Sequence, residues 1–270
     1  MESSDREKLL KSLELEERKE WEADESKFNN LYPSLNDPLF NKKIANKKQF
    51  NETRYNGEIL DIEKESKRLC ESEFELSPHQ QFVKNFLSLY TPYNSLLLYH
   101  GLGSGKTCSA IGVAEEMRDY IKQLGISQRI IIVASPNVQN NFKLQLFDES
   151  KLKLVDGLWN IKNCTGNKLL REINPLNMRG LSKQKVEKQI KRIINASYLF
   201  LGYIEFANYI AKVSAVSENE DARAAQNRLA KHFRNRLVII DEIHNVRIAD
   251  DAKDKKVAVE LEKLVKKVRG

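Results

Sequence analysis

The segment His100–Thr107, with the sequence HGLGSGKT, is the strongest constraint on the fold of this 270-residue chain. The apolar run Ser95–Tyr99 precedes it, and apolar residues recur every three or four positions after it as far as Tyr120. The run indicates a buried strand, and the later spacing indicates a helix. A glycine-rich turn between a strand and a helix can direct successive backbone N–H groups at a phosphate. We therefore expect a phosphate-binding loop here.

Lys106 and Thr107 end this turn with two side chains suited to phosphate chemistry. The lysine ammonium can reach two neighbouring phosphates, and the threonine hydroxyl can hold Mg²⁺. The segment departs from the full GxxxxGK[ST] pattern because His100 stands where the first glycine is usual. A glycine-rich turn that binds nothing is the alternative interpretation. The nucleotide-binding residues predicted from the turn are Gly101, Gly103, Ser104, Gly105, Lys106 and Thr107.

Short β-branched runs alternate with helical patterns through the rest of the chain. Buried strands are expected at Arg129–Ala134, Ala196–Gly202 and Arg236–Asp241. This alternation predicts an α/β fold with a doubly wound, mainly parallel sheet. We expect an acidic N-terminal extension, helical and irregular, over residues 1–75 and the α/β domain over residues 76–270.

Two carboxylates follow the strand that ends at Ile240. Asp241 and Glu242 are adjacent, and His244 comes two residues later. Because α/β sheets place their ligands at the carboxyl ends of strands, Asp241 is expected to hold Mg²⁺ and Glu242 to orient or activate an attacking water. A lone histidine would more often be a surface residue, but beside two carboxylates it is interpreted as functional. The predicted catalytic residues are Lys106, Asp241, Glu242 and His244.

These motifs resemble motifs I and II of superfamily 2 helicases and translocases, where they read GxGKT and DExH. The segment LSPHQ resembles a family motif whose glutamine reads adenine, which implies that role for Gln80. The segments Val133–Pro136 and Gly202–Asn208 occupy the places of motifs Ia and Ib, which contact the nucleic-acid backbone in the family. The resemblance thus implies nucleic-acid contacts at Ser135, Pro136, Tyr203 and Asn208.

Two longer segments, TPYNSLLLYHGLGSGKTCSAI and LFLGYIEFANYI, are similar to helicase-like transcription ATPases of large nucleocytoplasmic DNA viruses. These are the early transcription factor small subunit and the nucleoside triphosphatase I group. The resemblance runs from about Tyr32 to the C-terminus. It implies a RecA-like domain, ATP and Mg²⁺ as cofactors, and DNA or RNA as a partner. It also implies a viral RNA polymerase or transcription-factor subunit as a partner, in the host cytoplasm or the virion.

The sequence contains no Ser-Ala-Thr motif III and no second RecA-like domain, which carries the arginine fingers in the family. The resemblance therefore implies an incomplete first domain, and we expect the chain alone to bind nucleotide weakly and hydrolyse it slowly. One alternative is a non-catalytic nucleotide-binding module of a viral transcription or virion complex. Another is a nucleotide kinase or transporter ATPase, which the DEIH segment and the lack of an LSGGQ-like signature disfavour.

The net charge of +7 is unevenly distributed. Residues 1–75 carry −5 and the remainder +12, which points to a polyanion partner for the α/β domain, although lysine-rich solvated helices would give the same balance. The row of basic residues over 183–192 is interpreted as a solvated helix face in preference to a phosphate contact. Tyr203 and Phe206 suit either base stacking or core packing.

Several classes of protein are excluded. No apolar run reaches 18 residues, so a membrane-spanning helix is not expected, and the charged N-terminus is not a secretory signal. Residues 5–27 are expected to form a solvated helix or docking segment. Three widely spaced cysteines, with no CxxC, argue against a disulfide framework or zinc ribbon and favour a reducing, intracellular compartment. They are Cys70, Cys108 and Cys164.

Overall fold

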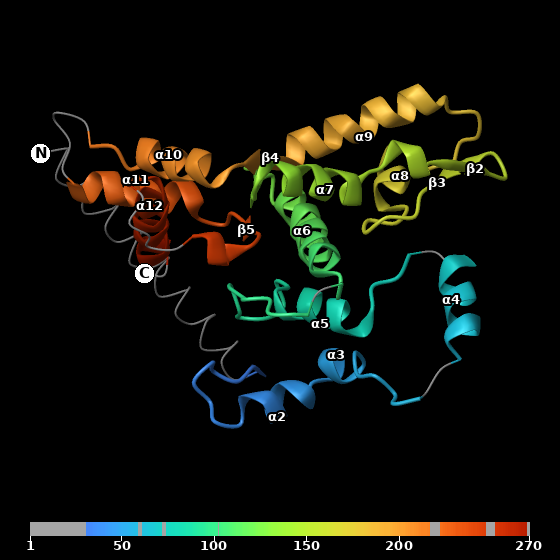
Figure 1. Cartoon of the computed structure of the whole chain (residues 1–270), viewed down its shortest axis with the longest axis horizontal. Helices are drawn as coiled ribbons and strands as arrows, with labels where there is room; N and C mark the ends of the chain where they lie inside the picture. Colours follow the sequence, from blue (N-terminus) through green and yellow to red (C-terminus); the bar gives the residue numbers. More distant parts are fainter. Residues whose placement is uncertain are drawn as a thin grey trace, which may run out of the picture. The chain divides into compact units, whose positions relative to one another are not determined.

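The computed structural model describes residues 31–58, 61–71, 74–101, 103–216, 222–246 and 252–268 (Figure 1). By internal contacts the chain forms two units. The first consists of Met1–Asp61 and Leu76–Ser109, and the second of Ile62–Glu75 and Ala110–Gly270. The helix expected over residues 5–27 lies outside the described residues.

The first unit is built on aromatic side chains. Its helices are α2 (Phe40–Ala45), α3 (Lys48–Asn51) and α5 (Pro78–Phe86). Phe50 packs against both Phe82 and Phe86 of α5, with ring centroids 5.0 and 6.4 Å apart. Residues 40–51, within the expected N-terminal extension, therefore supply two helices and part of this core. The buried members are Tyr32, Ile44, Phe50, Phe86 and Tyr93.

The expected strand at Ser95–Tyr99 is absent, because these residues form neither strand nor helix. Leu97 is 70% exposed and Tyr99 94% exposed. A strand is stable only where a neighbouring strand takes up its backbone hydrogen bonds, and within the described residues this segment has no such neighbour. The apolar composition of the segment alone could not show whether a neighbouring strand is available.

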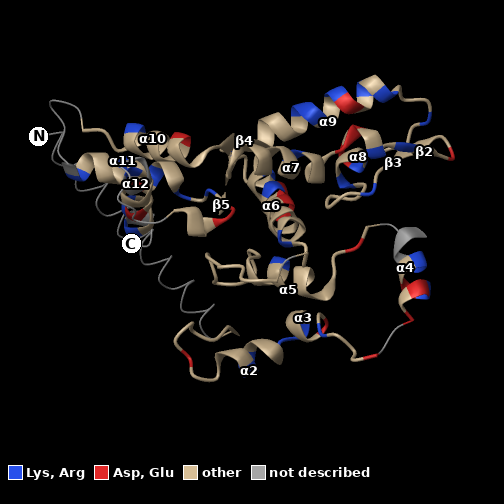
Figure 2. Cartoon of the chain, in the orientation of Figure 1, with Lys and Arg blue, Asp and Glu red and all other residues tan. Residues whose placement is uncertain are grey.

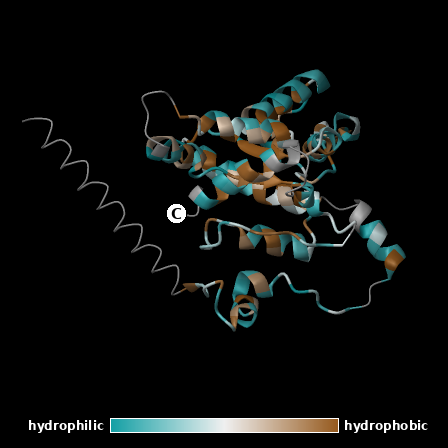
Figure 3. Ribbon diagram, turned by 60° about the vertical axis from the view of Figure 1, so that its left-hand side comes forward, coloured by the Kyte–Doolittle hydropathy of each residue, from teal (hydrophilic) through white to brown (hydrophobic). Residues whose placement is uncertain are grey.

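The second unit contains a parallel sheet of three strands in the order β4-β1-β5. The strands are β1 (Ile130–Val133), β4 (Tyr198–Leu201) and β5 (Val238–Ile240), all within segments predicted to be strands. Strand β1 is buried along its whole length, whereas β5 and most of β4 are half-buried. Figure 3 colours hydrophobic residues brown. The register places Ile132 between Phe200 and Ile239.

Helices cover both faces of this sheet. Ile131 and Val133 pack against α10 (Tyr203–Val213), α11 (Ala222–Phe233) and α12 (Ala252–Val268). Alternate strand residues face opposite sides, and Tyr198, beside Ile130, reaches Glu115 of α6 on the other face. The predicted doubly wound α/β fold is confirmed. The other helices are α4 (Ile62–Glu71), α6 (Lys106–Gln123), α7 (Pro136–Leu146) and α9 (Lys183–Ser197).

An insert over residues 148–182 lies between α7 and α9. It contains η1 (Glu149–Lys151), the antiparallel hairpin of β2 (Lys153–Val155) and β3 (Leu158–Asn160), and α8 (Lys168–Ile173). Asp156 and Gly157 form the two-residue hairpin turn with φ angles of 51° and 81°. Two positive φ angles match the twist of paired strands, which is why Asp-Gly favours this turn.

A buried ionic cluster ties α6 to α8. Arg118 is only 5% exposed and donates to Glu115 and to Glu172 at 2.8 Å each. Burial works against ionisation of Glu172, but its hydrogen bonds from Arg118 and Lys122 lower its pKa to about 2. The Tyr198 hydroxyl donates to Glu115, and burial raises the pKa of Tyr198 well above its usual value.

Among the described residues, no helix combines the length and apolar character needed to cross a membrane.

Candidate nucleotide-binding site

Gln80 fixes the glycine-rich loop to the start of α5. Its Oε1 accepts the Ser77 N–H at 2.9 Å, and its Nε2 donates to the Gly105 carbonyl at 3.2 Å. Pro78 occupies the first turn of α5. Gln80 is 8% exposed, so both ends of its amide are committed inside the protein.

His79 makes a second connection to the loop. Its Nε2 lies 2.8 Å from the Ser104 carbonyl oxygen, and its Nδ1 lies 2.8 Å from the Tyr55 hydroxyl. A carbonyl can only accept, so Nε2 carries the proton and donates. Neighbouring side chains of α5 thus hold two consecutive carbonyls of the loop, Ser104 and Gly105.

The loop itself requires glycine at two positions. Gly103 and Gly105 have φ angles of 75° and 78°, a region that side chains other than glycine rarely adopt. Lys106 begins α6, and its ammonium donates to the carbonyls of His100 at 3.0 Å and Gly101 at 3.2 Å. The lysine therefore folds over the loop that it follows, which is where a phosphate would meet it.

Thr107 fits a role in holding Mg²⁺. Its hydroxyl has no hydrogen-bond partner among the described residues, so its lone pairs are free to accept a cation. Across the described part of the chain, no three His, Cys, Asp or Glu side chains gather as a metal site.

The carboxyl ends of the strands bring other predicted residues together in the second unit. Ser135 follows β1 and caps α7, with Pro136 at the first helical position. Tyr203 follows β4 and begins α10, and its hydroxyl donates to the Asp241 carbonyl at 2.8 Å. The ends of β4 and β5 are thereby joined across β1, because parallel strands finish at one edge of the sheet.

The DEIH segment has a strained backbone. The Asp241 N–H donates to the Val133 carbonyl at 2.9 Å, which extends the ladder one residue past β5. Glu242 has a φ of 49°, costly for a non-glycine residue and often found at functional sites. The Asp241 carboxylate accepts the Glu242 N–H at 3.0 Å. His244 Nδ1 lies 3.1 Å from Glu242 Oε2, and the His244 side chain is 73% exposed.

The remaining nucleic-acid candidates have different surroundings. Asn208 is exposed on α10 and accepts a hydrogen bond from Lys256 of α12 at 2.7 Å. Phe206 is 2% exposed and belongs to the core. Of the two roles that the sequence allowed for Phe206, base stacking and core packing, the structure therefore supports packing. For Tyr203 the structure shows a hydrogen-bonding role that the sequence analysis missed.

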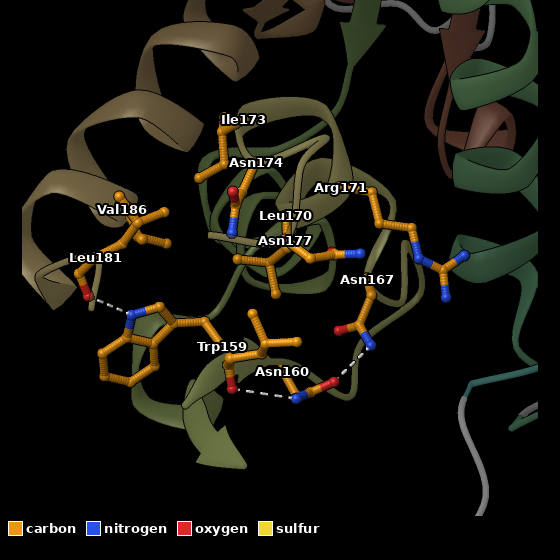
Figure 4. A pocket seen from close by; sticks show the side chains of 11 residues that line it. Trp159, Asn160, Asn167, Leu170, Arg171, Ile173, Asn174, Asn177, Leu181 and Val186 are labelled. Atoms are coloured by element: carbon orange, nitrogen blue, oxygen red, sulfur yellow. Dashed lines mark hydrogen bonds between the residues drawn. The ribbon is translucent and has the colours of Figure 1, made fainter. Parts of the chain in front are cut away.

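A cavity of about 240 Å³ lies in the insert, between β3, α8 and the start of α9 (Figure 4). Trp159 donates to the Leu181 carbonyl at 2.7 Å, and Asn167 donates to Asn160 Oδ1 at 2.8 Å. The Asn174 amide both donates to and accepts from the Met178 backbone. These hydrogen bonds connect the residues that line the cavity.

Curated proteins of large DNA viruses are similar to this chain over most of its length. "Putative helicase 087L" of Invertebrate iridescent virus 3 is 26% identical over 240 residues, 86% of this chain and 20% of the relative. "Putative helicase 009L" of Frog virus 3 is 29% identical over 63% of this chain and 15% of the relative. These matches support a helicase-like member of superfamily 2 from a large DNA virus. A "Putative ATP-dependent RNA helicase" of Acanthamoeba polyphaga mimivirus is 28% identical over 80% of the helicase-like chain and 31% of that relative.

The helicase-like chain thus spans between 15% and 31% of the length of these relatives. No protein-family model matches it. No solved structure matches it either.

Sequence reasoning missed His79 and Tyr55 as partners of the loop. His79 stands next to Gln80 in the LSPHQ segment, so its proximity to the motif was a usable signal. Tyr55 lies 24 residues before His79, and no local pattern connects the two. Only the fold of the first unit places its hydroxyl at the imidazole.

Proposed function

We propose that this helicase-like chain supplies the ATP-binding domain of a DNA-dependent ATPase that couples ATP hydrolysis to movement on, or remodelling of, nucleic acid. The observation that carries the proposal is the glycine-rich loop at the start of α6, with Lys106 folded over it and two carbonyls held by α5. In this proposal residues 76–270 form the ATP-binding domain and residues 1–75 an extension.

The residues of the loop have distinct proposed roles. Lys106 exchanges its two carbonyl partners for phosphate oxygens, which form stronger, charge-assisted hydrogen bonds. Thr107 and Asp241 hold Mg²⁺, which when bound neutralises charge on the transferred phosphoryl group. Gln80 keeps the loop in place through Gly105, and reading adenine would require its amide to release one of its two present partners.

Glu242 is proposed to orient the attacking water, with His244 beside its carboxylate. Its left-handed backbone turns the chain sharply at the end of β5, and the Asp241 carboxylate supports that turn through the Glu242 N–H. A residue held in this costly conformation by its neighbours keeps one orientation, which general-base chemistry requires.

Nucleic acid is proposed to contact the ends of β1 and β4, at Ser135, Pro136 and Tyr203, with Asn208 further along α10. The resemblance to viral transcription ATPases favours DNA as the ligand and a viral RNA polymerase or transcription-factor subunit as a protein partner. Names of relatives include RNA helicases, so both nucleic acids belong in the test.

A non-catalytic nucleotide-binding module is the second candidate function. One observation favours it: Ser95–Tyr99, directly before the loop, does not form the strand that such a loop is expected to follow. In such a module nucleotide would bind at the loop without hydrolysis.

ATP turnover with and without DNA or RNA, together with binding of a fluorescent ATP analogue, separates these functions. We expect Lys106→Ala to abolish nucleotide binding, and Glu242→Gln to retain binding while it lowers turnover at least about 100-fold. Binding without turnover in the unaltered chain would establish the module. Turnover unaffected by either substitution would refute the proposed chemistry.

A further inference from the structure

Half of the net charge of residues 76–270 lies in one short region of the second unit. Residues 148–197 contain eleven Lys and Arg against five Asp and Glu, a net charge of +6, while the whole chain carries +7. The rest of residues 76–270 carries the other +6 of that domain, and residues 1–75 carry −5. This region comprises the insert and α9, and Figure 2 shows the basic residues spaced along α9.

Helix α9 carries a basic row opposite its buried side. Val186, Ile190 and Ile194 are buried. The opposite side of the helix exposes three cations, Lys185, Lys188 and Arg192, among its exposed side chains. At 100° per residue these three lie within about 60° of one another, and their Cα atoms span about 10 Å of helix axis.

The row has no acidic partners among the described residues. Some exposed cations on other helices do pair with a carboxylate one turn away, as in Lys48–Glu52, Arg68–Glu65 and Lys266–Glu262. On α9 itself the flanking Lys183 and Lys191 pair with Glu187 and Glu149. Members of the row instead have like charges three or four residues away and make no ion pair among the described residues. Such spacing destabilises a helix unless an anion neutralises it.

The helix is held in a fixed position, as a docking surface needs. Trp159 binds the Leu181 carbonyl just before α9, and the Ser182 hydroxyl accepts the Lys185 N–H at 3.4 Å. Lys191 binds Glu149 of η1, and the Ser197 end of α9 runs directly into β4. The row is therefore presented by a supported helix and not by a loose segment.

We propose that Lys185, Lys188 and Arg192 form a phosphate-binding surface for one strand of nucleic acid. Successive phosphates along a strand lie about 3.4 Å apart on the helix axis of a duplex, so a 10 Å row spans roughly three nucleotides. The inference rests on the proposed nucleic-acid-dependent function and places a contact outside the strand ends. Of the two interpretations of the 183–192 row, it adopts the phosphate contact over the solvated face.

Charge reversal of the row tests this surface. The variant Lys185→Glu/Lys188→Glu/Arg192→Glu leaves the buried side of α9 unchanged, so thermal unfolding by circular dichroism should match that of the unaltered chain. The matched control is Arg223→Glu/Lys231→Glu/Arg234→Glu, which reverses three exposed cations of the same unit that also make no ion pair among the described residues.

Fluorescence anisotropy with labelled DNA and RNA strands of about 15 nucleotides, between about 50 and 200 mM salt, gives the readout. We expect the α9 variant to lower the slope of log affinity against log salt by about 2, because each single-strand phosphate contact contributes about 0.7. The control variant should change this slope by much less. Equal decreases of the slope in the α9 variant and the control variant, or an unchanged slope in the α9 variant, would overturn the proposed phosphate-binding surface. Either result would leave the proposed ATPase function intact.

Two further outcomes also count against the surface. If the unaltered chain binds ATP but no oligonucleotide, both this surface and the nucleic-acid part of the proposed function fail. If the α9 variant loses binding to phosphatidylserine vesicles but not to oligonucleotides, the row recognises a membrane instead.

Discussion

Replacing Gly105 by alanine should loosen the phosphate loop from α5. Gly105 has a φ of +78°, and a Cβ added there would lie 2.3 Å from Nε2 of Gln80. The left-handed conformation alone costs alanine about 1 kcal/mol. The Gln80 amide must also move, which removes its bonds to the Gly105 carbonyl and the Ser77 N–H, each contributing about 1 kcal/mol. The expected loss in free energy of unfolding is about 2–3 kcal/mol.

A double-mutant cycle with Gln80→Ala tests this reasoning. Without the glutamine side chain the added methyl group meets no obstacle, so Gly105→Ala should then cost only the backbone strain, about 1 kcal/mol. Gly57→Ala is the control, since Gly57 has a similar φ of +75° with nothing within 4 Å of its added Cβ. Its cost should be about 1 kcal/mol whether or not Gln80 is present.

Urea unfolding followed by circular dichroism measures the four corners of the cycle, and hydrogen exchange of α5 amides shows where the structure loosens. The Gly105→Ala protein should also bind the fluorescent ATP analogue more weakly. Strict additivity of Gly105→Ala and Gln80→Ala would refute the steric argument, because the two side chains would then not interact.

Three other changes have defined outcomes. Phe50→Ala, at a side chain 2% exposed, should lower the free energy of unfolding by about 3–5 kcal/mol in urea titrations; a loss below about 1 kcal/mol would contradict the aromatic core. Tyr203→Phe removes the hydroxyl bond to Asp241 and should cost about 1 kcal/mol, with faster hydrogen exchange at the end of β5. Burial opposes ionisation of Glu172, yet its bond from Arg118 helps to bring its pKa to about 2, below the usual 4.5. Its stabilising contribution is therefore complete above about pH 4.5 and is lost as the pH falls toward 2, so Glu172→Gln should show a flatter pH dependence of unfolding over that range.

The local pattern of the sequence was enough to predict most of the elements around the site. Strand β1 and helix α6 lie where apolar runs and three-to-four-residue spacing predicted them. Pro78 begins α5, and Asp241 and Glu242 leave the end of β5. These features depend on interactions within a turn or between neighbouring residues, so composition and spacing determine them.

Contacts between distant segments could not be predicted in this way. Ser95–Tyr99 has the composition of a strand, but a strand also needs a paired neighbour, which only the sheet can supply. The bond between Tyr55 and His79 and the bond between Tyr203 and the Asp241 backbone each depend on two elements meeting in space. No periodicity along the chain shows which distant residues will be in contact.

The sequence by itself determined that a glycine-rich turn opens a helix and that two carboxylates end a buried strand. Those properties follow from backbone freedom and side-chain spacing over a few residues. Only the tertiary structure decided that α5 holds the loop by two of its carbonyls, and that the basic row of α9 faces outward without acidic partners. The physical reason is that hydrogen bonding and charge neutralisation depend on distances in space, which packing sets.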